Sequence, residues 1–575
     1  MRTSEREPPW RRARPLRSVF NRRRAWPEAI VSRRPAGRRA SAPYGTRGGS
    51  AAMTPGPSSR SSTWSRRMNP SSARGSRSRA TGRPVTTGND TVRAVGGYLK
   101  RLVASGAAYQ AAGLLASLLA LVTLPLYTRH LTTADYGYAE TLLTFVILGS
   151  ILLRAGVGEA LVRFWFDDED HDRRIALARA TTGFVVLGST AVLGLGLLAS
   201  GPLSQLLLGT RDRELMAAGL LGLWAFTNLE IAYALLRVEE RRRAYLAASL
   251  TNVLLTVGLT VTLVVGLDAG AVGYVLGNYA ASTVVLLGVW WSLRDRVRLL
   301  PAGVRARLAA PLAFGLPTVP AEATVFLLNV VDRAYLLRVE SPAAAGVYAV
   351  AVKLATAVIV AVRAFQSAWP PLVYSVGDDD EARRLYAFIT TLYVLVTGAT
   401  VAALALLSRQ VVDLLAGPDF VTAHEALPWL ALGWALYGLN LVLVTIAGRA
   451  KVTTRNFPAA LAGVAVNVLA MVLLVPPLGI AGAGIALAVA YLVMIAVLHL
   501  LTRRLFVVPF EWRRLALAVA ILSAVAVSGE LLLPTAGAVG WLSRVAWLAW
   551  IPVLLLATRF LSAAERARLR ALLPR

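Results

Sequence analysis

The sequence predicts an all-α fold: a polytopic membrane helix bundle of about 14 transmembrane helices. Fourteen apolar stretches follow one another between residues 107 and 561, and the basic residues in the loops between them alternate in number. Each stretch is roughly 18–25 residues long, which suffices for a helix to cross a hydrocarbon core of about 30 Å. The mean hydropathy of +0.56 results from these stretches, and only 16% of the residues are charged.

Each apolar stretch is predicted to be one membrane span. The expected spans are 107–128, 139–157, 175–200, 215–236, 245–266, 271–293, 310–331, 344–366, 385–407, 427–448, 459–477, 481–502, 515–533 and 541–561.

The loops on the two sides of the membrane differ in basic content. The even-numbered junctions and the C-terminus hold 28 Lys and Arg residues, whereas the odd-numbered junctions hold seven. Cytoplasmic loops of membrane proteins carry such an excess. The bias therefore predicts a multi-pass plasma (inner) membrane protein with both termini in the cytoplasm. The loops on both sides are short, which leaves no room for a soluble catalytic domain.

Much of the formal charge of +29 lies in the first hundred residues. Residues 1–101 contain 24 of the 61 Lys and Arg residues and four of the 32 acidic ones. This Arg-, Ser-, Pro- and Gly-rich segment cannot bury enough apolar surface to fold, so disorder is expected. It could lie on anionic lipid, serve as a transit peptide or bind nucleic acid. It could equally precede the true start of the protein, and no nucleic-acid partner is predicted for the chain.

The first twelve spans contain an internal repeat. Gly137-Tyr138-Ala139 and Gly346-Val347-Tyr348-Ala349 correspond at an offset of 209 residues, and each is followed by an Arg-Ala pair, at Arg154 and Arg363. Two further matches have offsets of 212 and 215. A repeat of six spans keeps both copies in the same orientation, related by an axis along the membrane normal. We expect a tail (1–100), two six-helix lobes (101–300 and 301–505) and two extra helices with a basic tail (506–575).

Ionisable residues at membrane depth are costly and usually face a cavity or a partner. Most of them lie in the first two spans of each predicted lobe, or at the ends of those spans. Glu140, Arg179 and Glu530 are not counted among the candidates, because they lie close to a span end and lack a counterpart in the repeat. The predicted substrate-binding cations of a central cavity are Arg129, Arg154, Arg333, Lys353 and Arg363, and the predicted ion- or proton-coupling acids are Glu322, Glu230 and Asp332.

Each of these residues also has a structural interpretation. The four arginines could anchor span ends by extending to lipid head groups. Glu322 follows Pro317 and Pro320, which could bend the seventh helix into a hinge or mark a late helix start. The acidic runs 167–172 and 378–381 are interpreted as solvated loops. The chain has no Cys and four scattered His residues, so no metal site and no cofactor is predicted.

Three segments give the chain a resemblance to a known family. They are 124–131 running to 135–138, then Phe314-Gly315-Leu316-Pro317 leading to Asp332-Arg333, and Gly346-Val347-Tyr348 with Lys353 and Ala368-Trp369-Pro370. They resemble the oligosaccharide (O-antigen or teichoic-type) flippases of the multidrug/oligosaccharidyl-lipid/polysaccharide (MOP) exporter superfamily over about residues 95–505.

The resemblance implies translocation of a polyprenyl-diphosphate-linked oligosaccharide from the cytoplasmic to the outer leaflet, without catalysis. Alternating access through a basic central cavity is expected, since Arg bonds phosphate oxygens in pairs. The expected partners are this glycan lipid, membrane lipid, and the polymerase and glycosyltransferases of its pathway, and a monomer is expected. Two alternatives are a multidrug or cation antiporter of the same fold and a membrane glycan polymerase or ligase; a scaffold protein is a weaker third.

Overall fold

The computed structural model describes residues 115–167, 170–296, 304–328, 330–450 and 453–560. The predicted basic tail (1–100) lies outside the described residues. Every element of the described chain is a helix, and twelve helices are long and apolar enough to cross a membrane. The predicted all-α bundle is confirmed.

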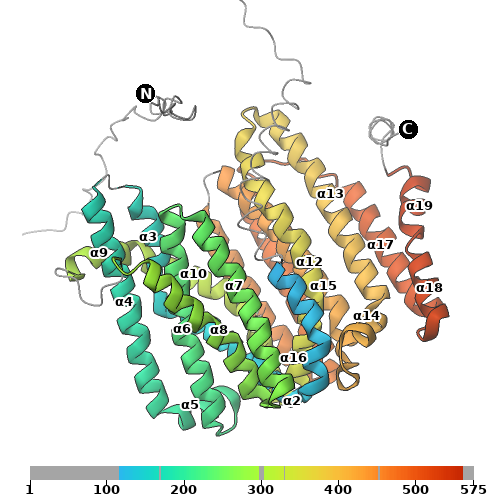
Figure 1. The fold of residues 1–575 in the computed structure, drawn as a ribbon. Helices are drawn as coiled ribbons and strands as arrows, with labels where there is room; N and C mark the ends of the chain where they lie inside the picture. The colour runs from blue at the N-terminus through green and yellow to red at the C-terminus, as the bar shows by residue number, and fades with distance from the viewer. Residues whose placement is uncertain (1–114, 168–169, 297–303, 329, 451–452, 561–575) are drawn as a thin grey trace, which may run out of the picture. The chain divides into compact units, whose positions relative to one another are not determined.

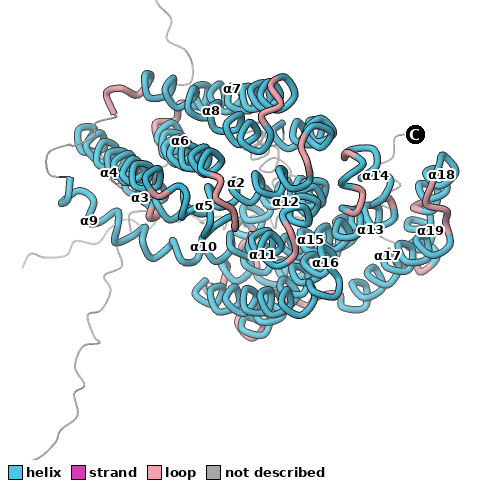
Figure 2. Tube along the Cα trace, turned by 90° about the horizontal axis from the view of Figure 1, so that it is seen from below, coloured by secondary structure: helices cyan, strands magenta, loops and turns pink. Residues whose placement is uncertain are grey.

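The first half of the bundle begins with a helix over residues 115–130. It continues with α2 (Thr133–Arg154), α3 (Val157–Trp165), α4 (His171–Leu198), α5 (Ser200–Leu208), α6 (Arg213–Val238), α7 (Arg242–Val261, extended by a π-helical turn over Thr262–Gly266) and α8 (Gly270–Ser292). Helix α6 packs against α2, α4 and α8, while α7 covers α8. Figures 1 and 2 show these helices side by side.

The second half follows in the same manner. It comprises α9 (Val304–Gly315), a 3₁₀ turn (Leu316–Thr318), α10 (Val319–Leu328), α11 (Val331–Val339), α12 (Pro342–Ser375), α13 (Asp379–Leu406), α14 (Ser408–Leu415), a 3₁₀ turn (Pro418–Phe420), α15 (Ala423–Arg449), a 3₁₀ turn (Thr453–Arg455) and α16 (Asn456–Thr502). Helix α15 packs between α12 and α16.

The structure interrupts the seventh predicted span and places the eleventh and twelfth in one long helix. The seventh is interrupted by the 3₁₀ turn that contains Pro317, because α9 ends at Gly315 and α10 begins at Val319, although the backbone stays helical at both residues. Spans 459–477 and 481–502 are the two halves of α16, which is interrupted at Gly479. This residue has φ 54° and ψ −134°, a backbone conformation that glycine adopts at little cost. The chain therefore turns there between two membrane crossings.

The acidic runs that were interpreted as loops include helix caps. Asp170 accepts a hydrogen bond from the backbone N–H of Asp172 at the start of α4. Asp378 does the same for Glu381 at the start of α13, at 2.7 Å. A capping carboxylate satisfies N–H groups that the helix cannot bond itself. These positions are thus explained by helix initiation.

The last helices, α17 (Trp512–Leu532), α18 (Gly537–Trp547) and α19 (Trp550–Ala557), lie at one edge of the bundle against α13. Arg544 of α18 is completely buried. Its guanidinium donates to a carboxylate oxygen of Glu530 at 2.6 Å and to the backbone carbonyl of Leu406 in α13 at 2.5 Å. Glu530, which is not among the predicted site residues, therefore joins Arg544 in fixing this hairpin to α13.

Candidate functional site

Helices α2 and α12 cross closely at the ends where both begin. A methyl group placed on Gly137 would lie 1.9 Å from the carbonyl oxygen of Pro342, and one placed on Gly346 would lie 1.9 Å from that of Thr133. Only glycine permits backbones to approach this far. Both contacts pair repeat-related residues, because 137 with 346 and 133 with 342 each differ by 209 positions. The contact between these repeat-related positions is therefore reciprocal.

The starts of the two helices are built alike. Thr132 caps α2 by accepting a hydrogen bond from the N–H of Asp135 at 3.1 Å. Ser341, again 209 positions further on, caps α12 through the N–H of Ala344 at 3.0 Å. A hydroxyl cap stabilises a helix by about 1 kcal/mol and defines its first residue. These caps place the glycines one turn into each helix, where the two backbones cross.

A charged pair lies beside this crossing. The Lys353 ammonium of α12 donates to a carboxylate oxygen of Glu140 in α2 at 2.5 Å and to the hydroxyl of Tyr274 in α8 at 2.6 Å. The Tyr274 hydroxyl also donates to Glu140, at 2.7 Å. The ring centroids of Tyr136 and Tyr274 lie 5.0 and 5.2 Å from the ammonium, which approaches Tyr274 from its hydroxyl end rather than over its face. The Glu140 side chain is only 7% exposed and that of Lys353 21%.

Helix α11 brings a second cation and a second acid to the same place. One guanidinium nitrogen of Arg333 lies 3.9 Å from Glu140 and donates to the hydroxyl of Thr144 at 2.8 Å. Asp332 is buried and accepts a hydrogen bond from the Tyr348 hydroxyl at 2.5 Å. Lys353 and Arg333 thus share the Glu140 carboxylate between α2, α8, α11 and α12, while Asp332, next to Arg333 in α11, is bonded to Tyr348 of α12. The structure brings the predicted Lys353 and Arg333 together on Glu140, which the prediction missed.

A cavity of about 390 Å³ opens beside Lys353 and Glu140. Side chains of the helix over 115–130 and of α2, α7 and α8 form its walls, with Tyr127, Asn252 and Asn278 among them. The side-chain oxygen of Asn252 is buried without a hydrogen-bond partner among the described residues. A buried polar atom favours the binding of a polar group in this cavity. The ion pair therefore lies at the wall of a partly polar chamber.

A second group of predicted residues lies near the other end of α2. Helix α2 ends at Arg154, and α3 begins at Val157. The two residues between the helices, Ala155 and Gly156, have positive φ values of 47° and 68°. Gly156 touches the break in the seventh span, since a methyl group on it would lie 2.2 Å from the carbonyl oxygen of Gly315. The two helix breaks are in direct contact.

Acidic residues surround Arg154 at this point. Its guanidinium lies 3.8 Å from a carboxylate oxygen of Glu322, in the first turn of α10. Arg154 and Glu230 line one cavity of about 390 Å³, together with Glu159 and Arg237. The structure thus brings Arg154, Glu322 and Glu230 together, as a group separate from the one around Lys353.

The other two predicted cations join neither group. Arg129 and Arg363 are both exposed on their helices. Glu140 was set aside for its position near a span end. Helical spacing could have identified it, because Tyr136, Glu140 and Thr144 recur every four residues and so share one face of α2. That face makes the contacts with Lys353, Tyr274 and Arg333.

Comparison with known proteins gives one family and a group of structures. The model of the family described as polysaccharide biosynthesis protein matches residues 102–375. No curated protein matches the sequence. A structure of the lipid II flippase MurJ in an inward closed conformation superposes with a TM-score of 0.65, at 12% identity over 79% of this chain and 98% of that one.

Multidrug transporters and a relative of theirs have the same fold. An inward-facing multidrug resistance MATE family transporter of the MOP superfamily gives a TM-score of 0.55, at 17% identity over 68% of this chain and 97% of that one. A MOP superfamily transporter from Pyrococcus furiosus, whose binding pocket is described as of reverse polarity, gives 0.51, at 17% identity over 71% and 94%.

The fold and the twelve candidate spans together define a class: a multi-pass membrane protein with the helical fold seen in MurJ and in MATE transporters. Within that class, the match over residues 102–375 confirms the resemblance to polysaccharide flippases that the sequence motifs indicated. The matched segment contains Glu140, Tyr274, Arg333 and Lys353.

Proposed function

We propose that the chain translocates a polyprenyl-diphosphate-linked oligosaccharide from the cytoplasmic to the outer leaflet for polysaccharide biosynthesis or export. It works by alternating access between the two six-helix lobes (101–300 and 301–505), in the plasma (inner) membrane with both termini in the cytoplasm. One observation carries the proposal: Lys353 of the second lobe is held by Glu140 and Tyr274 of the first, beside the partly polar chamber.

The diphosphate is the part of the cargo that this site suits. A diphosphate offers oxygens to two cations at once. Lys353 and Arg333 are such a pair, because both contact the carboxylate of Glu140. Removing one partner from a buried ion pair leaves a costly unpaired charge, whereas exchanging one anion for another does not. We infer that the diphosphate displaces Glu140 from Lys353. In this exchange Lys353 keeps an anionic partner, and Glu140, which retains the hydrogen bond with Tyr274, becomes the carboxylate that takes up a proton.

This exchange links cargo binding to movement of the lobes. The Lys353–Glu140 bond and the Gly137–Gly346 crossing join α12 to α2 at the end that the basic-loop bias places outside. While they hold, the outer side of the chamber is closed. Release of Lys353 removes the charged part of that closure, so that the lobes can separate there. Glu140 is a carboxylate at which a proton could be taken up during the cycle, in addition to Glu322, Glu230 and Asp332.

The proposal is tested by transport in reconstituted vesicles. A fluorescent polyprenyl-diphosphate oligosaccharide is placed in one leaflet, and its appearance in the other is followed with an impermeant quencher. Wild-type protein is expected to equilibrate the probe, Lys353→Gln to do so at least tenfold more slowly, and Arg384→Gln, an exposed control, at the wild-type rate. Transport of cationic drugs but no movement of the probe would make the chain an antiporter. Chemical extension of the glycan by the protein alone would make it a polymerase.

The displacement of Glu140 from Lys353 can be tested separately, by the reactivity of the Lys353 amine. The sequence contains three lysines, Lys100, Lys353 and Lys451, so amine labelling can be followed at each by mass spectrometry. Bound polyprenyl diphosphate is expected to change the labelling rate of Lys353 and to leave that of Lys100 unchanged. An unchanged Lys353 rate at saturating probe, with transport intact, would refute the exchange while leaving the function standing. We also propose that the chain acts as a monomer and that its partners are the polymerase and the glycosyltransferases of the same pathway.

A further inference from the structure

Two short helices, α5 and α14, occupy equivalent places in the predicted repeat. Leu206-Leu207-Leu208-Gly209 at the end of α5 corresponds to Leu414-Leu415-Ala416-Gly417 at the end of α14. The offset of 208 positions is close to the 209 that relates the two sides of the helix crossing. Figure 1 shows α5 and α14 at the same end of the bundle, which is the end that the basic-loop bias places outside.

The end of α5, in the first lobe, is held by a residue of the second. The guanidinium of Arg338, near the end of α11, donates to the backbone carbonyl of Gln205 at 3.0 Å and to that of Leu206. The last four carbonyls of a helix lack partners inside it and carry the negative end of its dipole, so they attract a cation. A methyl group on Gly209 would lie 3.4 Å from the same guanidinium. This contact is exposed at the surface.

The end of α14, in the second lobe, is held by a residue of the first. The backbone N–H of Gly417 donates to the hydroxyl of Thr128 at 2.8 Å, and that hydroxyl donates to the carbonyl of Leu124 at 2.9 Å. A methyl group on Gly417 would lie 2.3 Å from the carbonyl oxygen of Thr128, so the two backbones are in direct contact. Unlike the contact of Arg338, this one is buried.

The two contacts are related by the repeat. Thr128 and Arg129 correspond to Leu337 and Arg338 at an offset of 209 positions. The helix over 115–130 leads into α2 in the same way as α11 leads into α12. In each lobe, therefore, the segment before the crossing helix contacts the end of the other lobe's short helix. The arrangement is reciprocal, like the crossing of Gly137 with Gly346.

The contact at α14 continues to the buried charged pair. Phe420 follows Gly417 by three residues and is fully buried. Its ring meets that of Tyr136 in α2 edge to face, with centroids 5.7 Å apart. The ring centroid of Tyr136 in turn lies 5.0 Å from the ammonium of Lys353. One continuous set of contacts thus joins the lobes from α14 to Lys353.

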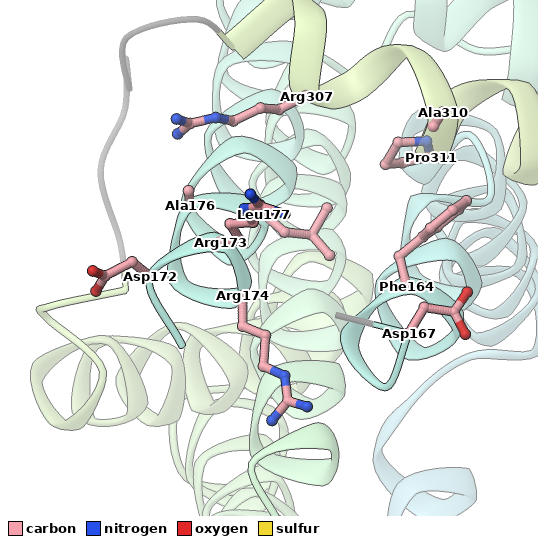
Figure 3. Close-up of a pocket in the computed structure, with 10 residues that line it drawn as sticks. All are labelled: Phe164, Asp167, Asp172, Arg173, Arg174, Ala176, Leu177, Arg307, Ala310 and Pro311. Atoms are coloured by element: carbon pink, nitrogen blue, oxygen red, sulfur yellow. The ribbon is translucent and has the colours of Figure 1, made fainter. Parts of the chain in front are cut away.

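The Arg-rich end of the lobes is built differently. Gly156 and Gly315 touch there, but a cavity of about 720 Å³ also lies between α9 of the second lobe and α3 and α4 of the first (Figure 3). Its lining includes Arg307 and Pro311 of α9 on one side and Phe164 of α3 on the other. The contacts of α5 and α14 are therefore features of the outer closure.

We propose that α5 and α14 are a pair of clasps that hold the two lobes together on the outer side, with Arg338 and Thr128 as positioning residues. The α14 clasp is a buried, neutral hydrogen bond, whereas the α5 clasp is an exposed contact that depends on charge. The lobes open outward only when both clasps release. This inference rests on the alternating access of the proposed function, but it does not depend on the cargo.

Labelling of one buried thiol tests the clasps. The chain contains no cysteine, so Ala349→Cys introduces a single thiol. Ala349 is fully buried and shares one face of α12 with Gly346 and Lys353, which both contact α2. An impermeant maleimide is added outside intact cells, and labelling is measured on the purified protein. The thiol is expected to react slowly, because it becomes accessible only when the lobes part on the outer side.

Loss of either clasp should speed this labelling. Arg338→Gln removes the donor to the α5 carbonyls and is expected to raise the rate about fivefold or more, with Arg338→Lys between it and the parent. Thr128→Val leaves the N–H of Gly417 without its acceptor and should act in the same direction. Thr128→Ser keeps the hydroxyl and should label at the parent rate. So should Arg211→Gln, the control that removes the same charge from an exposed position just after α5.

Three results would overturn the proposal. One is labelling of Arg338→Gln no faster than that of Arg211→Gln, and another is an equal rate in Thr128→Val and Thr128→Ser. The third is an equal acceleration at Ala431→Cys, a buried position inside the second lobe, since this would mean general loosening. No glycan lipid enters the measurement. Failure of the clasps therefore leaves the flippase proposal standing, and a chain that labels as expected but moves no glycan lipid contradicts the proposed function alone.

Discussion

Glu140 and Lys353 are 213 positions apart in the sequence, and their charged groups lie 2.5 Å apart in the fold. The pair joins α2 to α12 beside the point where these helices cross most closely. Its two members come from the two halves of the predicted repeat. Any movement that separates the halves at this end has to break the bond between them.

Replacement of Glu140 by Gln is expected to lower the free energy of unfolding by about 1–3 kcal/mol. The substitution leaves the largely buried Lys353 ammonium without its carboxylate. Thermal or denaturant unfolding in detergent measures the loss. The double variant Glu140→Gln/Lys353→Gln should lose less than the sum of the single variants, by about 1 kcal/mol or more. Strict additivity would mean that the two groups do not stabilise each other.

Transport should depend more on Lys353 than on Arg363. Both were predicted as cations of the cavity, but Lys353 is in the buried cluster, whereas Arg363 is exposed further along α12. We expect Lys353→Ala to abolish flipping and Arg363→Ala to reduce it by less than about tenfold. Complementation of a strain that lacks its flippase, with membrane insertion checked in parallel, compares them. Full complementation by Lys353→Ala would exclude the site.

The glycines of the helix crossing should not tolerate even a methyl group. Gly137→Ala and Gly346→Ala each place a carbon 1.9 Å from a carbonyl oxygen of the other helix. We expect each to lower the free energy of unfolding by about 1–3 kcal/mol or more. Gly188→Ala and Gly258→Ala are the controls, because an added methyl group meets nothing within 4 Å there. These controls should be neutral or stabilising by up to about 1 kcal/mol.

Replacement of Arg544 by Met is expected to weaken the attachment of the α17–α18 hairpin to α13. The change removes the donor to Glu530 and to the Leu406 carbonyl and leaves that buried carbonyl without its partner. Limited proteolysis is expected to cut between α17 and α18 faster than in wild type. Arg409→Met, at an exposed position on the same side of the bundle, should be cut at the wild-type rate.

The fold was largely predictable because membrane spans are local features of the sequence. Length and hydropathy identified α4, α6 and α17 to within a few residues at most ends, since a span needs only its own apolar residues. The positions at which helices are interrupted were harder to predict from the sequence. The interruption after Gly315 could be suspected from Pro317, and the end of α2 at Arg154 lies close to the end of the predicted span 139–157. The contact of Gly156 with Gly315 could not be predicted, because the two residues lie far apart in the sequence.

The candidate site was only half predictable for the same reason. A lysine ten residues inside an apolar helix is conspicuous, so Lys353 could be selected from the sequence. Its partner Glu140 lies eight residues into α2, which begins earlier than the predicted span, and seemed to belong to a helix end. Helix packing decides which carboxylate neutralises a buried lysine. A local sequence pattern does not contain that information.

The reciprocal contact of Gly137 with Gly346 has the geometry of an isologous dimer interface contained in one chain. In a true homodimer, both sides of the axis would have to carry the same residues. Because the two halves are joined in one chain, their sequences can differ at corresponding positions. The counterpart of Glu140 in the repeat is Ala349, and the counterpart of Lys353 is Thr144, which accepts a hydrogen bond from Arg333. A single acid and a single lysine can therefore face each other near the axis, an arrangement that two identical subunits could only have in duplicate.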